Sequence, residues 1–546
     1  MRRRFDYVVV GAGAAGSVIA ARLAEAGNAS VLVLEAGPSD ASVLIRMPGA
    51  QAYPLMDKSR TWLFETGPEP ALNNRIIPHL RGRMVGGSSS LNGMVYVRGN
   101  PRDFDSWADA GNATWSYAHC LPYFRKLETY DKGADTYRGA SGPVHVSTMK
   151  AELPIFQAFL RAGQQAGQLL NPDYNGYRQE GVHIHQANID HGTRDSAGRA
   201  YLWPALKSGN VEIRMNAQAT GIRFDDGRKA VGVDFLVRDE PEFVEAEREV
   251  ILCGGAYGSP HLLLLSGVGD RTQLAKHGIA CVADVPGVGR SLQDHPCVGV
   301  KYRSARPGVS PGYNMHLLKM AWTGAQWLLA RTGLGASNLW ETGSFFKSHP
   351  GVDYVNIQHE FVPLLGDYGQ GKMVVEEGFY YSTCLMRPTS RGSLELLSAD
   401  PHRLPRIVHN YLQASEDQRA LTAAVKYTDQ IIQTSAWDEI RGAGISPPLR
   451  TMPDEEVLAW LRASVSTQYH PCSTCRMGSD DLAVVDDTAR VHGVEQLRVA
   501  DASIMPSITS GNLQSPTLML AEKISDHIKG VVMPPDPQDY ADKQHH

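Results

Sequence analysis

Residues 5–35 read FDYVVVGAGAAGSVIAARLAEAGNASVLVLE, and this stretch decides the fold of the chain. Phe5–Val10 is a short, mostly apolar and β-branched run, which is typical of a buried parallel strand. The alanine-rich residues 17–26 predict a helix, and Ser30–Leu34 predicts a second strand that ends at Glu35. Strand, glycine-rich turn, helix and strand in this order predict the βαβ unit of a doubly wound α/β domain.

The turn between strand and helix has the glycine spacing of a dinucleotide site. Gly11 permits a tight turn, Gly13 leaves room for a pyrophosphate, and Gly16 lets the helix pack closely on the strand. The free N–H groups of the helix N-terminus favour phosphate binding. Glu35 is placed to accept from ribose hydroxyls and argues against a 2′-phosphate, so NADP is disfavoured while FAD and NAD stay open. We include the neighbouring Ala14 and Ala36 among the cofactor contacts.

Length and composition limit the remaining possibilities. A chain of 546 residues with 42% hydrophobic and 20% charged residues predicts two domains, whose segments can be interleaved in sequence. A formal charge of −5 does not suit a nucleic-acid-binding protein. No run of about 18 apolar residues occurs, and we interpret MRRRFDYVVV as a first strand and not as a signal peptide. We expect a cytoplasmic protein and leave peripheral contact with the inner membrane open.

Seven cysteines in this length do not form a disulfide framework. Cys472 and Cys475 form a CxxC, but no second CxxC or paired histidine run completes a zinc site. We therefore expect no metal and a local packing role for both cysteines.

Four further motifs carry a resemblance to a known family. They are GRMVGGSSSLNGMVYVRGN at 82–100, GAYGSPHLLLLSGVG at 255–269, YHPCSTCRMG from Tyr469, and GNLQSPTLMLAEK ending at Lys523. Together they resemble the signature and catalytic segments of the glucose–methanol–choline oxidoreductase family, and the resemblance runs from about Phe5 to Gly530. The segments GPEPALNNR from Gly67 and GASNLWETGSFFKS from Gly335 look most like those of bacterial choline dehydrogenases.

The resemblance implies bound FAD and a Rossmann-like FAD-binding domain with an interleaved α+β substrate-binding domain. We expect the FAD-binding domain at 1–152, 201–300 and 464–530, the substrate-binding domain at 153–200 and 301–463, and a flexible tail at 531–546. The family's flavin loop corresponds to Arg83–Val95. Candidate cofactor contacts in this loop and elsewhere are Arg83, Gly86, Gly87, Ser88, Asn92, Gly93, Met94, Val95, Ala219, Asp501 and Ala502. Leu91 stands where some relatives carry a flavin-linking histidine, which predicts non-covalent FAD.

The resemblance also names a catalytic pair, His470 and Asn512. Imidazole titrates near neutrality and suits a general base, whereas an amide donates hydrogen bonds but does not accept a proton. We therefore expect His470 to remove the hydroxyl proton of a primary alcohol and Asn512 to stabilise the alkoxide. The carbinol carbon would pass hydride to flavin N5, giving an aldehyde. A helix cap or turn is an additional role open to Asn512.

Candidate substrate contacts are Trp340, Glu341, Gln468, Tyr469 and Gln514. A carboxylate beside an aromatic face suits a quaternary ammonium, so Trp340 and Glu341 suggest a cation site. Relatives that act on uncharged alcohols carry similar segments, so a structural role for Glu341 is the alternative. The alternatives left open are an oxidase or dehydrogenase for a non-cationic alcohol, an FAD-containing lyase and an NAD-linked enzyme.

The electron acceptor, oxygen or a quinone, and a homo-oligomer also stay open. Met315, Met320, Trp322, Trp327, Leu328 and Leu329 predict an amphipathic helix that packs in the core, with membrane contact as the alternative.

Overall fold

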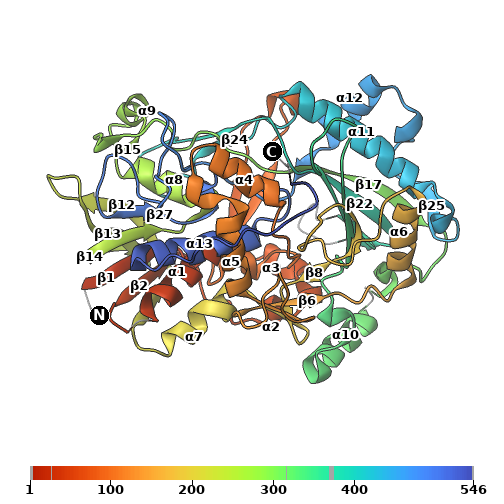
Figure 1. Cartoon of the computed structure of the whole chain (residues 1–546), viewed down its shortest axis with the longest axis horizontal. Helices are drawn as coiled ribbons and strands as arrows, with labels where there is room; N and C mark the ends of the chain where they lie inside the picture. Colours follow the sequence, from red (N-terminus) through yellow and green to blue (C-terminus); the bar gives the residue numbers. More distant parts are fainter. Residues whose placement is uncertain (1–3, 26, 315–316, 368–373, 544–546) are drawn as a thin grey trace.

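The computed structural model describes residues 4–25, 27–314, 317–367 and 374–543. The two strands of the N-terminal βαβ unit belong to the first of two large sheets (Figure 1). The strand order is β11-β2-β1-β14-β13-β12, and β27 pairs with the end of β14. The strands are β1 (Arg4–Val10), β2 (Val31–Glu35), β11 (Val211–Met215), β12 (Ala217–Phe224), β13 (Ala230–Val237), β14 (Glu240–Leu252) and β27 (Leu497–Val499). The strands β11, β2, β1, β14 and β27 pair in parallel, whereas β12, β13 and β14 pair antiparallel.

The first strand and helix follow the sequence prediction closely. The segment read as a strand and not as a signal peptide is β1, which is paired on both sides. Helix α1 (Ala14–Ala24) begins three residues before the predicted start, because the chain turns directly from Gly13 into the helix. Its predicted last residue, Ala26, lies outside the described residues.

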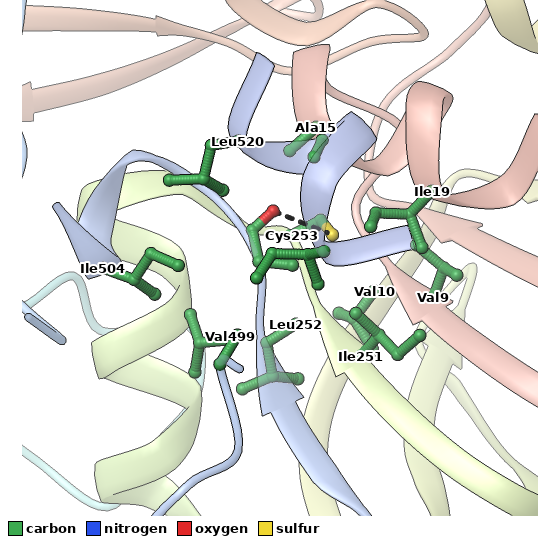
Figure 2. Packing of buried hydrophobic residues seen from close by; sticks show 14 of the residues in the cluster. Val9, Val10, Ala15, Ile19, Ile251, Leu252, Cys253, Val499, Ile504 and Leu520 are labelled. Atoms are coloured by element: carbon green, nitrogen blue, oxygen red, sulfur yellow. Dashed lines mark hydrogen bonds between the residues drawn. The ribbon is translucent and has the colours of Figure 1, made fainter. Parts of the chain in front are cut away.

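Helix α1 lies against α13 (Gln514–Lys529), which in turn packs on α5 (Tyr117–Leu127). Figure 2 shows apolar side chains of β1, α1, β14 and α13, including Val9, Ile19, Ile251 and Leu520, meeting around Cys253. The core between sheet and helices therefore brings the first and last parts of the chain together.

A second sheet is entirely antiparallel and has the order β25-β17-β22-β19-β18-β7, with β26 paired to β17. Its strands are β7 (Gly181–Ile184), β17 (Pro296–Ser304), β18 (Thr342–Phe346), β19 (Ile357–Val362), β22 (Gly378–Leu385), β25 (Arg441–Gly444) and β26 (Ser466–Thr467). Helices α6 (Pro154–Gln165), α11 (Ser415–Ile432) and α12 (Asp454–Ser464) share a separate apolar core with this sheet. The two sheets lie at opposite ends of the long axis in Figure 1.

The expected α/β fold with an interleaved second unit is confirmed. The first sheet takes its strands from three separate stretches of the chain, and the second sheet takes its strands from the two stretches between them. The domain limits given above stay a proposal, which the two separate cores favour. Smaller elements include β3 (Thr61–Glu65), β4 (Pro78–Gly82), α4 (Pro101–Asp109), α7 (Trp203–Leu206), α8 (Gly255–Leu265) and α9 (Arg271–Lys276).

The prediction of a flexible tail is wrong for residues 531–543. Tyr540 is buried against the first unit, with its hydroxyl donating to Asp105. The N–H of Asp536 donates to the carbonyl of Ala118 at 2.8 Å. An aromatic anchor and backbone hydrogen bonds thus hold a segment whose polar, proline-rich composition suggested disorder.

The predicted amphipathic helix is α10 (Leu317–Ala330), but it does not pack as expected. Trp327 is buried, whereas Trp322 is 70% exposed and Leu329 is 89% exposed. The prediction of core packing is therefore wrong for most of its apolar residues. Met315 lies outside the described residues. Within the described ranges, no helix has the length and apolar character needed to cross a membrane.

Candidate active site

A single cavity of about 850 Å³ contains most of the predicted site residues. Gly11 and Gly13 of the dinucleotide turn line it, and so do His470 and Asn512. The other predicted residues that line it are Ala14, Glu35, Ala36, Gly87, Ser88, Asn92, Gly93, Met94, Val95, Ala219, Trp340, Gln468, Tyr469, Asp501, Ala502 and Gln514. Its volume is that of a large cofactor or ligand site.

Close backbone approaches at two glycines form one wall. A Cβ on Gly11, whose φ is +106°, would lie 2.6 Å from the carbonyl oxygen of Cys253. A Cβ on Gly87, whose φ is +53°, would lie 2.8 Å from the Cα of Gly13. The dinucleotide turn and the serine-rich loop therefore touch, and a side chain on either would displace the backbone that a pyrophosphate needs.

Glu35 and Asp501 are the buried carboxylates of this wall. Glu35 Oε2 accepts from the N–H of Ala12 at 2.9 Å and Oε1 accepts from that of Gly37 at 2.8 Å. Burial raises the pKa of Glu35 to about 7, while the two backbone donors oppose the shift. Asp501 Oδ2 accepts from the Gly255 N–H at 2.8 Å. These carboxylates face a glycine cradle, and this arrangement fits the ADP half of FAD.

Four predicted residues do not line the cavity: Gly16, Arg83, Gly86 and Glu341. A Cβ on Gly16 would lie 1.8 Å from the carbonyl oxygen of Gly11, so this glycine serves helix packing, as expected. Gly86 has a φ of +81° and donates its N–H to the Ala12 carbonyl at 2.7 Å. The Arg83 guanidinium lies over the Trp62 ring, 4.8 Å from its centroid. Three of the four, Gly16, Arg83 and Gly86, therefore support residues that line the cavity without lining it themselves.

Glu341 is not placed to hold a substrate cation. Its Oε2 accepts from the N–H of Ala151 at 2.6 Å, and its Oε1 accepts from the hydroxyl of Ser337 at 2.5 Å. The following strand turns the carboxylate away from the cavity, although the adjacent Trp340 lines it. The expected substrate role of Glu341 is therefore corrected to a structural one.

Glu360, on β19, is a buried carboxylate that does line the cavity. Its Oε1 accepts from Asn512 Nδ2 at 2.9 Å, and its Oε2 accepts from Gln468 Nε2. Burial raises the pKa of Glu360, and the two amide donors oppose this shift. Sequence reasoning missed Glu360; the signal was a charged residue within the otherwise uncharged strand IQHEFV.

His470 is presented by a turn whose backbone is fixed by Asp294. The N–H of His470 donates to Asp294 Oδ1 at 2.6 Å, and Nδ1 of His470 lies 3.0 Å from Nδ1 of His295. His295 Nε2 lies 3.1 Å from the carbonyl oxygen of Met386, which can only accept. Neutral His295 therefore carries its hydrogen on Nε2, and its Nδ1 accepts from Nδ1–H of His470.

This hydrogen-bond count leaves Nε2 of His470 without a hydrogen and able to accept a proton. Burial lowers the pKa of His470 well below its ordinary value, and His295 and Arg81 lower it further. Burial also lowers the pKa of His295 to about 3. Both rings are thus neutral at physiological pH. Neither Asp294 nor His295 was identified from the sequence, where the adjacent pair in LQDHP was the available signal.

Asn512 is held by two neighbours on β19. Besides donating to Glu360, it accepts from Gln358 Nε2 through Oδ1 at 3.1 Å. One amide hydrogen of Asn512 is used by Glu360, which leaves the second for a ligand oxygen. Gln514 accepts from Asn92 Nδ2 and thereby joins the helix that follows Asn512 to the serine-rich loop.

The two cysteines after His470 are free and fully buried. Their backbone N–H groups donate to the carbonyls of Gln293 and Ser503, at 3.0 and 2.8 Å. These contacts agree with the expected packing role.

The family models of GMC oxidoreductases match residues 5–297 and 388–521. The chain is 44% identical to an oxygen-dependent choline dehydrogenase of Staphylococcus xylosus, over 100% of this chain and 98% of the relative. It is also 44% identical to an oxygen-dependent choline dehydrogenase of Escherichia coli O17:K52:H18, over 96% of each chain.

Two solved structures share the whole architecture. Pyridoxine 4-oxidase from Mesorbium loti has a TM-score of 0.87 at 28% identity, covering 96% of this chain and 99% of the other. An R554K variant of Aspergillus oryzae RIB40 formate oxidase, studied for FAD modification, has a TM-score of 0.90 at 27% identity, covering 96% and 98%. With the cavity and its glycine cradle, these likenesses show that the chain belongs to the GMC oxidoreductase family and is an FAD-dependent enzyme that oxidises alcohols.

Proposed function

We propose that this enzyme oxidises a primary alcohol bearing a quaternary ammonium group, as choline does, and that His470 is the base. The observation that carries the proposal is the shared cavity, in which His470, Asn512 and the buried carboxylate of Glu360 face one space. The relatives named as choline dehydrogenases support the substrate class.

His470 would take the hydroxyl proton on Nε2, while Nδ1–H stays donated to His295. The developing alkoxide would accept the second amide hydrogen of Asn512, whose plane is fixed by Glu360 and Gln358. FAD bound between the glycine cradle and these residues would supply the hydride acceptor. The protein's own contribution is to orient the alcohol, hold its proton and stabilise negative charge on its oxygen.

Glu360 replaces Glu341 as the residue proposed to attract the substrate cation. Its carboxylate accepts two side-chain hydrogen bonds inside the cavity and carries no ion pair among the described residues. A quaternary ammonium, which cannot donate hydrogen bonds, would supply charge without competing with Asn512 and Gln468 for the same lone pairs. Trp340 lines the same cavity and offers an aromatic face for the methyl groups.

We propose that FAD is bound without a covalent link. Leu91, at the position where some relatives attach the flavin, is buried beside Ile45 and Met84 and lines the cavity. A leucine side chain has no nucleophilic atom for such a bond.

We also propose that helix α10 makes the peripheral membrane contact. Leu318, Trp322 and Leu329 are exposed on it at helical spacing, by 85%, 70% and 89%. Such a face favours insertion into the interfacial region of a bilayer. Sedimentation with lipid vesicles, comparing the natural chain with Trp322→Ser, measures the contact.

The function is tested by anaerobic addition of choline to the yellow holoenzyme. Loss of flavin absorbance near 450 nm, with betaine aldehyde formed in equal amount, is the expected result. Absence of reduction by choline together with reduction by a neutral primary alcohol would remove the cation proposal. Absence of reduction by any alcohol would favour a lyase. Oxygen uptake, compared with reduction of a quinone, then identifies the electron acceptor.

A further inference from the structure

A buried cluster behind the His470 turn takes no part in the chemistry proposed above. It consists of Asp294, Tyr411, His79, Tyr257 and His409, all buried. The rings of His79 and His409 stack with centroids 4.5 Å apart and an interplanar angle of 11°. Neutral buried imidazoles need hydrogen-bond partners, so the cluster must have an internal order of donors and acceptors.

Asp294 clamps the backbone that presents the base. Its Oδ1 accepts from the His470 N–H at 2.6 Å, and its Oδ2 accepts from the hydroxyl of Thr467. The Thr467 hydroxyl oxygen in turn accepts from the Tyr469 N–H at 2.7 Å. Tyr469 has a φ of +63°, a left-handed conformation that is unfavourable for a non-glycine residue. Asp294 therefore holds the N–H of His470 directly and the N–H of Tyr469 through the Thr467 hydroxyl.

Hydrogen counting gives the rest of the cluster a single direction. The Tyr411 hydroxyl donates to Asp294 Oδ2, so its oxygen accepts from His79 Nε2 at 3.1 Å. His79 Nδ1 then carries a lone pair and accepts from the Tyr257 hydroxyl at 2.9 Å. Having used its hydrogen, the Tyr257 oxygen accepts from His409 Nε2 at 2.9 Å. The donors therefore point from His409 towards Asp294 at every step.

His409, at the end of this series of hydrogen bonds farthest from Asp294, determines the direction. His409 Nδ1 has no hydrogen-bond partner among the described residues. In the direction given above this atom is a buried lone pair, whereas in the reversed direction it would be a buried N–H without an acceptor. Unpaired buried N–H groups are the rarer and more costly case. Burial lowers the pKa of His79 well below its ordinary value and that of His409 to about 3, so each ring carries one hydrogen.

We propose that Asp294 is a positioning residue for His470, and that Tyr411, His79, Tyr257 and His409 form a one-directional hydrogen-bond relay that supports its carboxylate. The inference rests on the proposed role of His470 as the base. The relay fixes the turn that presents the imidazole. Burial raises the pKa of Asp294, whereas the hydrogen bonds from Thr467, Tyr411 and the His470 N–H and the charge of Arg81 oppose this shift and favour the carboxylate. The negative charge of this carboxylate would stabilise the positive charge that His470 gains when it holds the substrate proton.

Other charged or titratable groups also act on the His470 ring. They are Arg81, whose Nη1 donates to the Tyr469 carbonyl at 2.5 Å, and His295, and both lower the pKa of His470. Glu360 lines the same cavity as His470. Arg81 opposes the imidazolium, whereas Glu360 would be balanced by the substrate cation. Asp294 is therefore the carboxylate that remains to compensate His470 once substrate is bound.

The same residues satisfy a simple distance test for a metal site, since ligand atoms of His79, Asp294 and His409 lie within 4.8 Å of one another. Their hydrogen bonds favour the relay instead. Both nitrogens of His79 face tyrosine hydroxyls, and Asp294 Oδ2 already accepts from two hydroxyls. A metal ion would have to break these bonds or deprotonate a tyrosine, and burial raises the pKa of both tyrosines well above their ordinary value.

The test measures the rate of flavin reduction by choline in stopped flow with FAD-loaded variants. Asp294→Asn removes a charged acceptor worth about 10- to 100-fold, and we expect a loss of this size in the limiting rate with little change in apparent Kd. Tyr411→Phe should lower the limiting rate of flavin reduction about 2- to 10-fold. Among the described residues, the Tyr257 hydroxyl bonds His79 and His409. Tyr257→Phe keeps the ring that lines the cavity and removes this hydroxyl, so the limiting rate should fall about 2-fold because the relay is broken at a distance from Asp294. Tyr302→Phe removes a comparable tyrosine–aspartate bond to Asp429 outside the site and should change nothing.

The pH profile and the tautomers separate positioning from general destabilisation. Asp294→Asn should move the acid limb of the limiting rate to lower pH, because it removes the negative charge that favours the imidazolium. In ¹⁵N-histidine spectra, His79 and His409 should carry hydrogen on Nε2 in the natural enzyme and on Nδ1 in Asp294→Asn. Their signals are assigned from His79→Phe and His409→Phe.

Three results would overturn the relay: an unchanged rate and pH limb in Asp294→Asn, an Nδ1–H tautomer in the natural enzyme, or a stoichiometric metal lost in His79→Phe. If Asp294→Asn fails to fold, the rates of Tyr411→Phe and Tyr257→Phe decide for or against the relay. If His470→Ala reduces flavin normally, the proposed function itself fails. An inactive His470→Ala with fully active Asp294 and Tyr411 variants rejects the relay alone.

Discussion

Nδ1 of His470 lies 3.0 Å from Nδ1 of His295, so the hydrogen of one ring decides the state of the other. The Met386 carbonyl fixes the hydrogen of His295 on Nε2, and this leaves Nε2 of His470 as a lone pair. A backbone carbonyl outside the cavity thus prepares the base for its reaction. The arrangement requires a neutral pair, which burial ensures for both rings.

The first prediction concerns the pH dependence of kcat/KM, which reports the free enzyme. The base must be unprotonated, and burial lowers the pKa of His470 well below its ordinary value of about 6.5. The value of kcat/KM for choline should therefore stay level from neutral pH down through pH 6.5 and fall only at lower pH. Steady-state assays in overlapping buffers measure it. An acid limb centred above pH 6.5 would contradict the assignment of this ring as the base.

The second prediction is the loss of chemistry in His470→Ala. A positioned general base contributes about 100- to 10,000-fold, so flavin reduction by choline should slow by a factor in this range. FAD content should remain near one per chain, because the glycine cradle is untouched. Stopped-flow absorbance measures the rate. His191→Ala, at a histidine whose side chain is 95% exposed, serves as the control and should reduce at the natural rate.

The third prediction compares two glutamates. Glu360→Gln should lower kcat/KM for choline at least about 10-fold, because it removes the cavity's proposed counter-charge. The same variant should affect 3,3-dimethylbutan-1-ol, a neutral analogue of the same shape, much less. Glu341→Gln is the matched control: its carboxylate is bound to Ser337 and the Ala151 amide, so the ratio of the two substrates should stay unchanged. The opposite pattern would restore the cation role to Glu341.

The residues predicted for the cofactor half follow largely from one local pattern, whereas the substrate half depends on contacts between distant segments. Gly11, Gly13 and Glu35 form a local pattern, since a βαβ unit places the end of its second strand beside the glycine turn that follows the first. Glu360 reaches the cavity only through the pairing of β19 with β18 and β22. Asp294, just before β17, lies behind the cavity and bonds the distant His470 turn. Both are contacts between distant segments. Glu341 was misassigned because its motif gives its position along the chain but not the direction of its side chain.

The fourth prediction concerns the flavin linkage. Acid precipitation of the holoenzyme should leave the yellow colour in the supernatant, because Leu91 provides no atom for a covalent bond. Absorbance of supernatant and pellet after trichloroacetic acid measures the distribution. Colour retained in the pellet would show a link through another residue, and peptide mapping would then identify it.

The fifth prediction tests the ion pair that joins the first and last helices of the FAD-binding unit. Glu522 on α13 is fully buried and accepts from Arg22 on α1 at 2.8 Å, with Lys126 Nζ at 3.1 Å as a second cation. Removing one partner of a buried pair costs roughly 3–5 kcal/mol, and Lys126 should hold the loss of Arg22→Ala to the lower part of this range.

Thermal unfolding of the FAD-loaded enzyme should therefore show a lower Tm for Arg22→Ala, by several degrees. Arg4→Ala breaks an exposed pair with Glu245, whose two side chains are 60% and 43% exposed, and should shift the Tm by less than about 1 °C. Equal Tm shifts in both variants would mean that the buried pair of Arg22 and Glu522 stabilises the fold no more than the exposed pair of Arg4 and Glu245. Because the α1 N-terminus carries the dinucleotide turn, Arg22→Ala should also weaken FAD retention, whereas Arg4→Ala should not.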